Sequence, residues 1–236
     1  MTAETLPASI AASLPPALTP TPPGFVPMTD AERDTYQSRR SIALRREQAA
    51  DWFAGVCPSA YHPDRTDWSH KGIAPYLTQI ARVRGWQPPP PNSSAPPGLI
   101  LSGDTFRGKS RAMFALMHRL RVDELRPCAF FTAAGFFARL GEQVKFGRDD
   151  AREWIDGVAR HPFFFLDDLG QEAVLTSRQD HARQWFFNFL DIRRGERLPL
   201  FVSTNLTAAQ ISNTPGDMRS DPLLSRLLEL CDPVKF

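Results

Sequence analysis

A glycine-rich segment that ends in a lysine and a serine is the first set of residues able to do chemistry. Residues 103–110 read Gly-Asp-Thr-Phe-Arg-Gly-Lys-Ser, the pattern G-x-x-x-x-G-K-[ST]. Its glycines let backbone N–H groups surround phosphate oxygens, its lysine reaches the β- and γ-phosphates, and its serine hydroxyl ligates Mg²⁺. We therefore expect a nucleoside triphosphate to lie against Gly103, Asp104, Thr105, Phe106, Arg107, Gly108, Lys109, Ser110 and Arg111.

Two adjacent carboxylates follow an apolar run about sixty residues later. Residues 163–166 are Phe-Phe-Phe-Leu, and Asp167 and Asp168 come directly after them. In a nucleotide site the first carboxylate holds Mg²⁺ and the second polarises the attacking water. We expect Asp167 to share a metal ion with Ser110, and Asp168 to act on the water. A buried strand that ends in a polar turn is the alternative that this motif alone leaves open.

Two further polar side chains occur later in the chain. Asn205 ends the run Leu-Phe-Val-Ser-Thr-Asn, where its amide can reach between the carboxylates and the γ-phosphate to orient water. Asparagine also begins turns and caps helices. Arg226 lies in an amphipathic segment and can project to the γ-phosphate of a neighbouring subunit as an arginine finger. Arg219 is the second candidate for that role, and a surface arginine is the alternative for both.

Alternating strands and helices must position these residues. Hydrophobic periodicity predicts strands at 99–102, 128–132, 163–166 and 198–203, and helices at 111–121, 134–146, 150–160, 179–193 and 221–230. This alternation predicts an α/β three-layer sandwich, in which helices cover both faces of a central parallel sheet. Polar residues at the carboxyl ends of parallel strands then meet at one edge of the sheet.

Composition divides the chain into four stretches. Residues 1–28 are rich in Pro, Ala and Thr and predict a disordered tail. Residues 29–85 hold two helical patterns and predict a small helical region that binds a partner, although a solvated helix packed on its own domain fits equally well. Residues 86–97 predict a proline-rich linker, and residues 98–236 form the nucleotide-binding domain.

Length and hydropathy restrict the class of protein further. The chain has 236 residues, of which 42% are hydrophobic, and this is enough for one substantial α/β core. No apolar stretch reaches the roughly 18 to 20 residues that a membrane span needs, and the first residues lack a signal-peptide pattern. We therefore expect a cytoplasmic protein with no membrane association.

The motifs, in this order, resemble those of the AAA+ ATPases. Within that class they resemble the DnaC and IstB type, which comprises replicative helicase loaders and transposition helper ATPases. The resemblance is carried by residues 98–112, 163–170, 201–206 and 225–229, and its more specific parts are Asp-Asp-Leu-Gly and Ser-Thr-Asn-Leu. Residues 57–61 also look like the amino-terminal region of phage and prophage members.

This resemblance implies a fold, cofactors and residue roles. The fold is the AAA+ type of P-loop NTPase without a full C-terminal lid domain, and the cofactors are ATP and Mg²⁺. By the same resemblance Asp168 is the catalytic base, Asn205 is the residue called sensor 1, and Arg226 is the finger. The protein is expected to self-associate through the ATP site, because the finger acts on a neighbour.

The resemblance also implies a function. It predicts a slow ATPase, stimulated by a partner or by DNA, that loads a replicative helicase in DNA replication. Single-stranded DNA is a further expected partner, with Lys-Phe-Gly-Arg at 145–148 as its candidate patch. Two alternatives stay open: an IstB-like transposition helper that binds DNA, and an ATP-dependent adaptor that does not hydrolyse ATP. Phe106, at a position where the family usually has glycine, and the missing lid both permit the adaptor.

Overall fold

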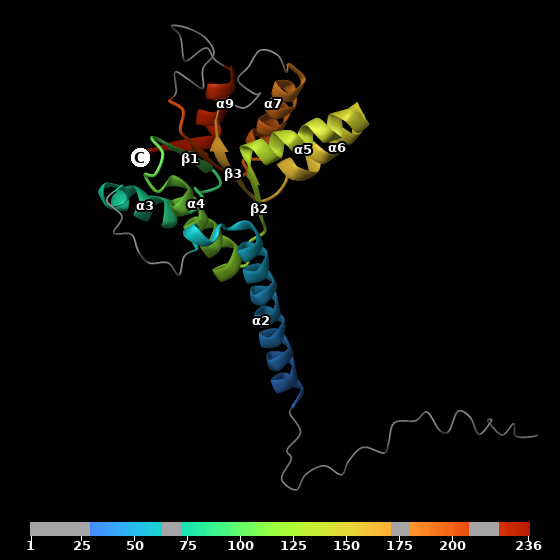
Figure 1. The fold of residues 1–236 in the computed structure, drawn as a ribbon. Coiled ribbons are helices and arrows are strands. Elements are labelled where there is room, and N and C mark those ends of the chain that lie inside the picture. The colour runs from blue at the N-terminus through green and yellow to red at the C-terminus, as the bar shows by residue number, and fades with distance from the viewer. Residues whose placement is uncertain (1–28, 63–71, 171–179, 208–221) are drawn as a thin grey trace, which may run out of the picture. The chain divides into compact units, whose positions relative to one another are not determined.

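The computed structural model describes residues 29–62, 72–170, 180–207 and 222–236 (Figure 1). The predicted tail, residues 1–28, and the second finger candidate, Arg219, lie outside these ranges. The chain divides into two compact units, residues 1–43 and residues 44–236. All the elements that carry the predicted motifs belong to the second unit.

The described part of the first unit is the beginning of helix α2 (Asp30–Val56). Thr29 and Glu32 cap this helix reciprocally. The Glu32 backbone N–H donates to Thr29 Oγ1 at 3.3 Å, and the Thr29 backbone N–H donates to a Glu32 carboxylate oxygen at 2.8 Å. These bonds satisfy N–H groups that the first turn of a helix leaves without partners. The helix therefore begins where the sequence supplies its cap.

Five parallel strands form the sheet of the second unit within the described residues. They are β1 (Gly98–Ser102), β2 (Cys128–Thr132), β3 (Phe163–Leu169), β4 (Leu200–Thr204) and β5 (Cys231–Lys235). Their order across the sheet is β2-β3-β4-β1-β5. The four strands that we expected are thus confirmed. Because β4 lies between β3 and β1, the ends of these three strands are neighbours at one edge.

Strand β5 is an edge strand that the sequence analysis did not predict. It pairs with β1 from Gly98 opposite Cys231 to Ser102 opposite Lys235. Its sequence, Cys-Asp-Pro-Val-Lys, holds few apolar residues and a central proline, which usually argues against a strand. Proline is tolerated at the edge of a sheet, because its missing N–H is not needed for a second neighbour.

Helices cover both faces of the sheet, as the βα alternation predicts. One face carries α5 (Ala133–Phe146), α6 (Arg148–Ala159), α7 (Asp180–Gly195) and α9 (Pro222–Leu230). The other carries α3 (Leu77–Arg84), α4 (Lys109–His118), the 3₁₀ turn η1 (Ser59–Tyr61) and the end of α2, with a second 3₁₀ turn η2 (Ala74–Tyr76) before α3 and a π-helical end η3 (Arg119–Asp123) after α4. The α/β three-layer fold is therefore confirmed.

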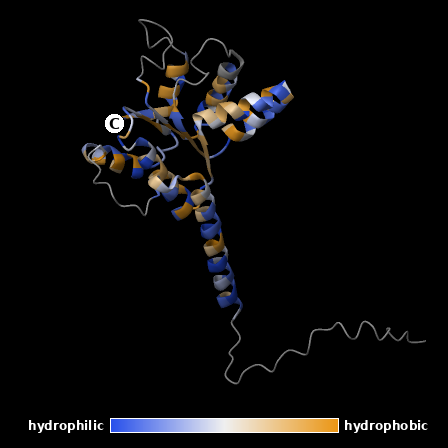
Figure 2. Cartoon of the chain, in the orientation of Figure 1, coloured by the Kyte–Doolittle hydropathy of each residue, from blue (hydrophilic) through white to orange (hydrophobic). Residues whose placement is uncertain are grey.

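The sheet separates two apolar cores. Alternate residues of a strand point to opposite faces, so Phe164 packs in the core beneath α5 and α7, and Phe165 packs in the core beneath α4. In Figure 2 the central strands are largely orange, whereas the ends of α5 and α6 that point away from the sheet are blue. Burial on both faces explains why the β3 sequence is a continuous apolar run.

Residues 44–62 and 72–97 contribute to the second core. Phe53, Val83 and Trp86 are buried there. The Phe53 ring packs edge-on against His118 of α4 with ring centroids 5.0 Å apart, and Trp86 packs edge-on against Phe201 of β4 at 4.9 Å. The chain from Leu44 onward, the predicted linker at residues 86–97 included, belongs to one compact unit with the sheet.

No helix within the described ranges is long and apolar enough to cross a membrane.

Candidate nucleotide-binding site

The predicted phosphate loop connects β1 to α4, as its sequence context requires. Gly103 and Gly108 have φ angles of 138° and 95°, which favour glycine. A Cβ atom at Gly103 would lie 2.1 Å from the backbone oxygen of Phe236, so a side chain has no room there. Helix α4 begins at Lys109, and its amino-terminal end therefore offers unpaired N–H groups and positive potential to an anion in the loop.

Lys109 is held inside the loop by three oxygen acceptors. Its Nζ donates to the backbone oxygens of Gly103 at 2.8 Å and Asp104 at 2.6 Å, and to Asn205 Oδ1 at 2.7 Å. Burial lowers the pKa of this ammonium group, whereas the carboxylate of Asp168 acts in the opposite direction. The contact with Asn205 joins the loop to the end of β4.

Ser110 and Asp167 form a pair of hard oxygen ligands. Ser110 Oγ donates to Asp167 Oδ1 at 3.0 Å, although the two residues lie on different elements, α4 and β3. Burial raises the pKa of the Asp167 carboxyl, and its hydrogen bonds with Ser203 and Ser110 lower it. Mg²⁺ prefers such oxygens and takes its remaining ligands from water and phosphates, so the pair fits this ion. A cation here would also neutralise a buried carboxylate.

A β-bulge lets two adjacent carboxylates face the same pocket. Neighbouring side chains of a regular strand point to opposite sides of the sheet. The register between β3 and β4 shifts between Leu166 and Leu169, and Asp168 has a φ of 57°, in the left-handed region. Asp167 and Asp168 consequently both line the pocket. Asn205 Nδ2 donates to Asp168 Oδ1 at 3.1 Å, so Asn205 contacts both Lys109 and Asp168.

Sequence analysis missed the two residues that hold this bulge in place, Ser203 and Thr204. Ser203 Oγ accepts the backbone N–H of Asp168 at 2.9 Å and donates to Asp167 Oδ1. Thr204 Oγ1 donates to the backbone oxygen of Leu169 and accepts the backbone N–H of Leu206 at 3.0 Å. Both side chains are buried. The available signal was their polarity at the end of an otherwise apolar, buried strand.

We expect Ser203→Ala to lower ATP turnover about tenfold and to change ATP affinity by less than about threefold. The substitution leaves the Asp168 N–H without its acceptor, and a buried donor without a partner costs about 1–3 kcal/mol. The substitution therefore disturbs the positions of Asp167 and Asp168, while the hydrogen bonds of Lys109 stay intact. Turnover rates and equilibrium ATP binding, measured on the same preparation, test this. Ser94→Ala, at an exposed serine, is the control, and equal losses of turnover in both variants would contradict the role of Ser203.

The motif residues line one pocket of about 520 Å³, a size that suits a small ligand. Its polar side holds Lys109, Ser110, Asp167, Asp168, Ser203 and Asn205, and its loop side holds Thr105, Phe106, Arg107, Gly108 and Arg111. Gly103 and Asp104 contribute the carbonyl oxygens that hold Lys109. The structure thus brings together the predicted residues of three separate motifs.

A further wall of the pocket comes from the segment before the sheet. Ala60, Tyr61 and Ile73 line it, and the Tyr61 ring stacks on Phe114 of α4 with centroids 5.6 Å apart. Ile73 also lies against Gly108, where a Cβ atom would be 3.4 Å from its methyl carbon. These apolar side chains suit the less polar part of a nucleotide. The sequence analysis did not assign them to the site.

Phe106 lies on the rim of the pocket and does not fill it. Its side chain is 86% exposed, and its φ of 60° is in the left-handed region. A bulky residue in that conformation costs about 1–3 kcal/mol. The loop needs a left-handed residue at position 106, which explains why the family that this sequence resembles usually has glycine there. Because the Phe106 side chain points to solvent, it leaves the pocket open beside Lys109.

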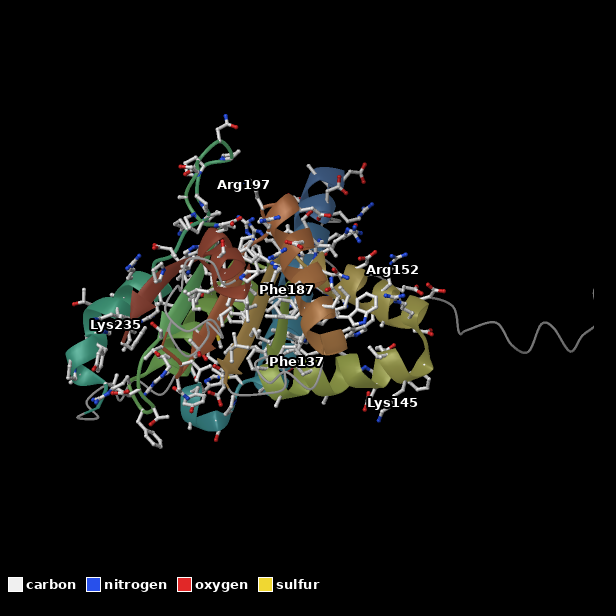
Figure 3. All side chains as sticks on the ribbon, turned by 90° about the horizontal axis from the view of Figure 1, so that it is seen from above. Phe137, Lys145, Arg152, Phe187, Arg197 and Lys235 are labelled. Carbon is white, nitrogen blue, oxygen red and sulfur yellow. The ribbon has the colours of Figure 1, made fainter. Side chains whose placement is uncertain are left out.

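Arg226 is not among the residues that line this pocket. Its Nε donates to Asp191 Oδ1 of α7 at 2.7 Å, and its Nη2 donates to Asp191 Oδ2 at 3.3 Å. The guanidinium group lies 4.9 Å from the ring centroid of Phe187, which Figure 3 labels on α7. The structure therefore places this predicted catalytic residue away from the pocket of its own chain.

No model of a protein family matches this sequence, and no curated protein matches it either. Solved structures do match. DnaI shares 20% identity over 76% of this chain and 91% of its own, with a TM-score of 0.52. The DnaC helicase loader shares 20% identity over 75% and 94%, with a TM-score of 0.50. The replication initiator DnaA bound to AMPPCP and single-stranded DNA shares 14% identity over 77% and 51%, with a TM-score of 0.53.

These likenesses establish the class of fold. The chain has the AAA+ type of P-loop NTPase fold, and the expected resemblance to DnaC-type proteins is confirmed at the level of the fold.

Proposed function

We propose that this chain is a cytoplasmic ATPase that binds ATP and Mg²⁺ and acts as a DnaC-like loader of a replicative helicase. The observation that carries the proposal is the position of Asn205, which hydrogen-bonds both Lys109 and Asp168 and so joins three motifs in one site. The loader role is supported by the fold neighbours, since one of them is the DnaC helicase loader and this chain covers 94% of it.

The side chains divide the work of hydrolysis among them. Lys109 neutralises phosphate charge, and Ser110 with Asp167 would hold Mg²⁺. When bound, this ion supplies positive charge to the phosphate oxygens as bonds to them change. Asp168 Oδ1 is fixed by the Asn205 amide, and we assign its Oδ2 to the attacking water. The carboxylate then orients the water and accepts its proton.

The same geometry favours hydrolysis over the adaptor alternative. An adaptor that only binds ATP has no need for an ordered second carboxylate. Asp168, however, is held in a strained conformation by two hydrogen bonds: its backbone N–H donates to Ser203 Oγ, and its Oδ1 accepts from the Asn205 amide. Phe106, which by sequence permits the adaptor, is exposed and leaves the pocket open. The arrangement thus supports an enzyme.

The proposal also covers the expected partners. Lys145, Phe146 and Arg148 are exposed at the turn between α5 and α6, and the Phe146 side chain is 77% exposed (Lys145 is labelled in Figure 3). An exposed aromatic ring between cations suits base stacking with single-stranded DNA. Because Arg226 lies outside its own pocket, we propose that it acts in the pocket of a second copy. For helicase binding we propose the predicted region, residues 29–85, and within it residues 29–43, in which Tyr36 and Ile42 are exposed.

The experiment that tests the function is ATP turnover with Mg²⁺, measured alone, with single-stranded oligothymidylate and with the replicative helicase of the same host. We expect slow turnover that rises when the helicase or the DNA is added. ATP binding with background turnover under every condition would overturn the enzymatic role and support the adaptor. Stimulation by duplex DNA alone would favour the transposition helper.

A further inference from the structure

The contacts of Arg226 use only part of its hydrogen-bonding capacity. A guanidinium group has five N–H donors in a fixed planar arrangement. Three of them are used: Nε and Nη2 donate to the two oxygens of Asp191, and Nη1 donates to the backbone oxygen of Pro222 at 3.1 Å. Among the residues that the structure describes, one N–H on each η nitrogen has no acceptor, and the side chain is 25% exposed. Two parallel N–H groups are the arrangement that binds a phosphate.

The guanidinium group is held from two directions. Asp191 and Phe187 are four residues apart on α7, so they lie one above the other on the same face of that helix. Asp191 binds one edge of the guanidinium group, and Phe187 lies 4.9 Å from it across the ring face. The carboxylate also raises the pKa of Arg226, which keeps the group charged.

We propose that Asp191 is a positioning residue that holds Arg226 ready to donate its two remaining N–H groups to a phosphate in the pocket of a second copy. The inference rests on the proposed function, in which Arg226 acts on a neighbour. A free arginine side chain samples many rotamers, and fixing it at the moment of binding costs free energy. The contact with Asp191 fixes one rotamer of Arg226 before the protomers meet.

A matched ion pair on the same two helices provides the control. Arg194 of α7 pairs with Glu229 of α9 at 3.0 Å, across the same two helices as the pair of Asp191 and Arg226, and Arg194 also lies 3.4 Å from Asp191 Oδ1. Glu229→Gln therefore breaks one contact between α7 and α9 and leaves the two oxygens of Asp191 on Arg226. If turnover falls only because the two helices pack less tightly, it falls in the Asp191→Ala and the Glu229→Gln variants alike.

Mixed protomers test the inference in the full chain. Arg226→Ala protomers keep their own pocket but donate no finger, and Lys109→Ala protomers donate a finger but lack a working pocket. With ATP, Mg²⁺ and oligothymidylate, each variant alone is expected to be inactive, and the mixture is expected to regain turnover. Replacing Lys109→Ala by the double variant Lys109→Ala/Asp191→Ala is expected to lower the regained turnover about tenfold. The double variant Lys109→Ala/Glu229→Gln is expected to match Lys109→Ala.

Each outcome decides a separate point. Equal turnover in the mixtures with and without Asp191 would overturn the positioning role alone. Higher turnover without Asp191 would also overturn it, because Asp191 would then restrain the finger. No restoration by Lys109→Ala itself would overturn the action of Arg226 on a neighbour, and the positioning role with it. Sedimentation of each mixture with ATP provides a readout of assembly. A drop in assembled protein that matches the drop in turnover would also overturn the positioning role.

Discussion

Lys109→Ala is expected to lower ATP turnover by at least about 10²-fold, and to weaken ATP binding by a similar factor. Lys109 is the buried cation of the pocket, and its Nζ already makes three hydrogen bonds with the loop and with Asn205. A hydrogen bond to a charged group contributes about 1.5–3 kcal/mol, and the ammonium group is placed to contact two phosphates. Loss of two such contacts corresponds to about 3–6 kcal/mol, or roughly 10²- to 10⁴-fold.

The variant also removes a positive charge that interacts with the carboxylates of Asp104, Asp167 and Asp168. Their repulsion of triphosphate then adds to the loss of direct contacts. Equilibrium binding of ATP and steady-state turnover both measure the effect. Lys235→Ala makes the same chemical change at an exposed lysine of β5, and we expect it to leave both quantities unchanged (Lys235 is labelled in Figure 3). Turnover above a tenth of the original rate in Lys109→Ala would contradict the assigned site.

Asp168→Asn is expected to separate binding from chemistry. Turnover should fall by about 10²- to 10⁴-fold, the usual contribution of a general base, while ATP affinity stays equal or rises. An amide cannot accept the proton of the attacking water, and the substitution removes a negative charge beside the phosphates. The side chain keeps its size, and asparagine tolerates the φ of 57° as well as aspartate does. The backbone of the bulge therefore has no reason to change.

The measurement is the ratio of turnover rate to ATP affinity for the variant and the original chain. Asp156→Asn supplies the same change at a surface carboxylate of α6, which pairs with Arg160 just beyond the end of that helix, and should leave the ratio unaltered. Retained turnover in Asp168→Asn would mean that another group activates the water. Together, Lys109→Ala and Asp168→Asn distinguish a protein that hydrolyses ATP from one that only binds it, because the adaptor would respond to the first substitution alone.

Much of the site follows from local sequence, because local geometry determines it. A strand, a glycine-rich turn and a helix place Lys109 and Ser110 at a helix start wherever they occur together. The apolar run of β3 predicted a buried parallel strand, and parallel strands bring their carboxyl ends to one edge. That Asp167 and Asn205 lie near the loop was therefore predictable from the positions of the motifs at the ends of parallel strands, and the structure bears this geometry out.

Other features depend on contacts between distant parts of the chain, and only the folded protein decides them. The bulge that turns Asp168 into the pocket needs Ser203 of a neighbouring strand. Tyr61 reaches the pocket because its ring packs on α4, and β5 forms although its sequence disfavours a strand, because β1 offers it an edge.

For Arg226, too, local sequence indicates one property and the tertiary structure decides another. Its segment alone indicates an arginine on an amphipathic helix, and nothing near it in sequence points to Asp191, which is 35 residues away. Side-chain periodicity reports which face of an element is apolar, and it carries no information about which element packs against that face. The sequence by itself therefore determined the elements and the chemistry of the motifs. The tertiary structure decided their partners, because packing across the sheet sets the distances at which those side chains can bond.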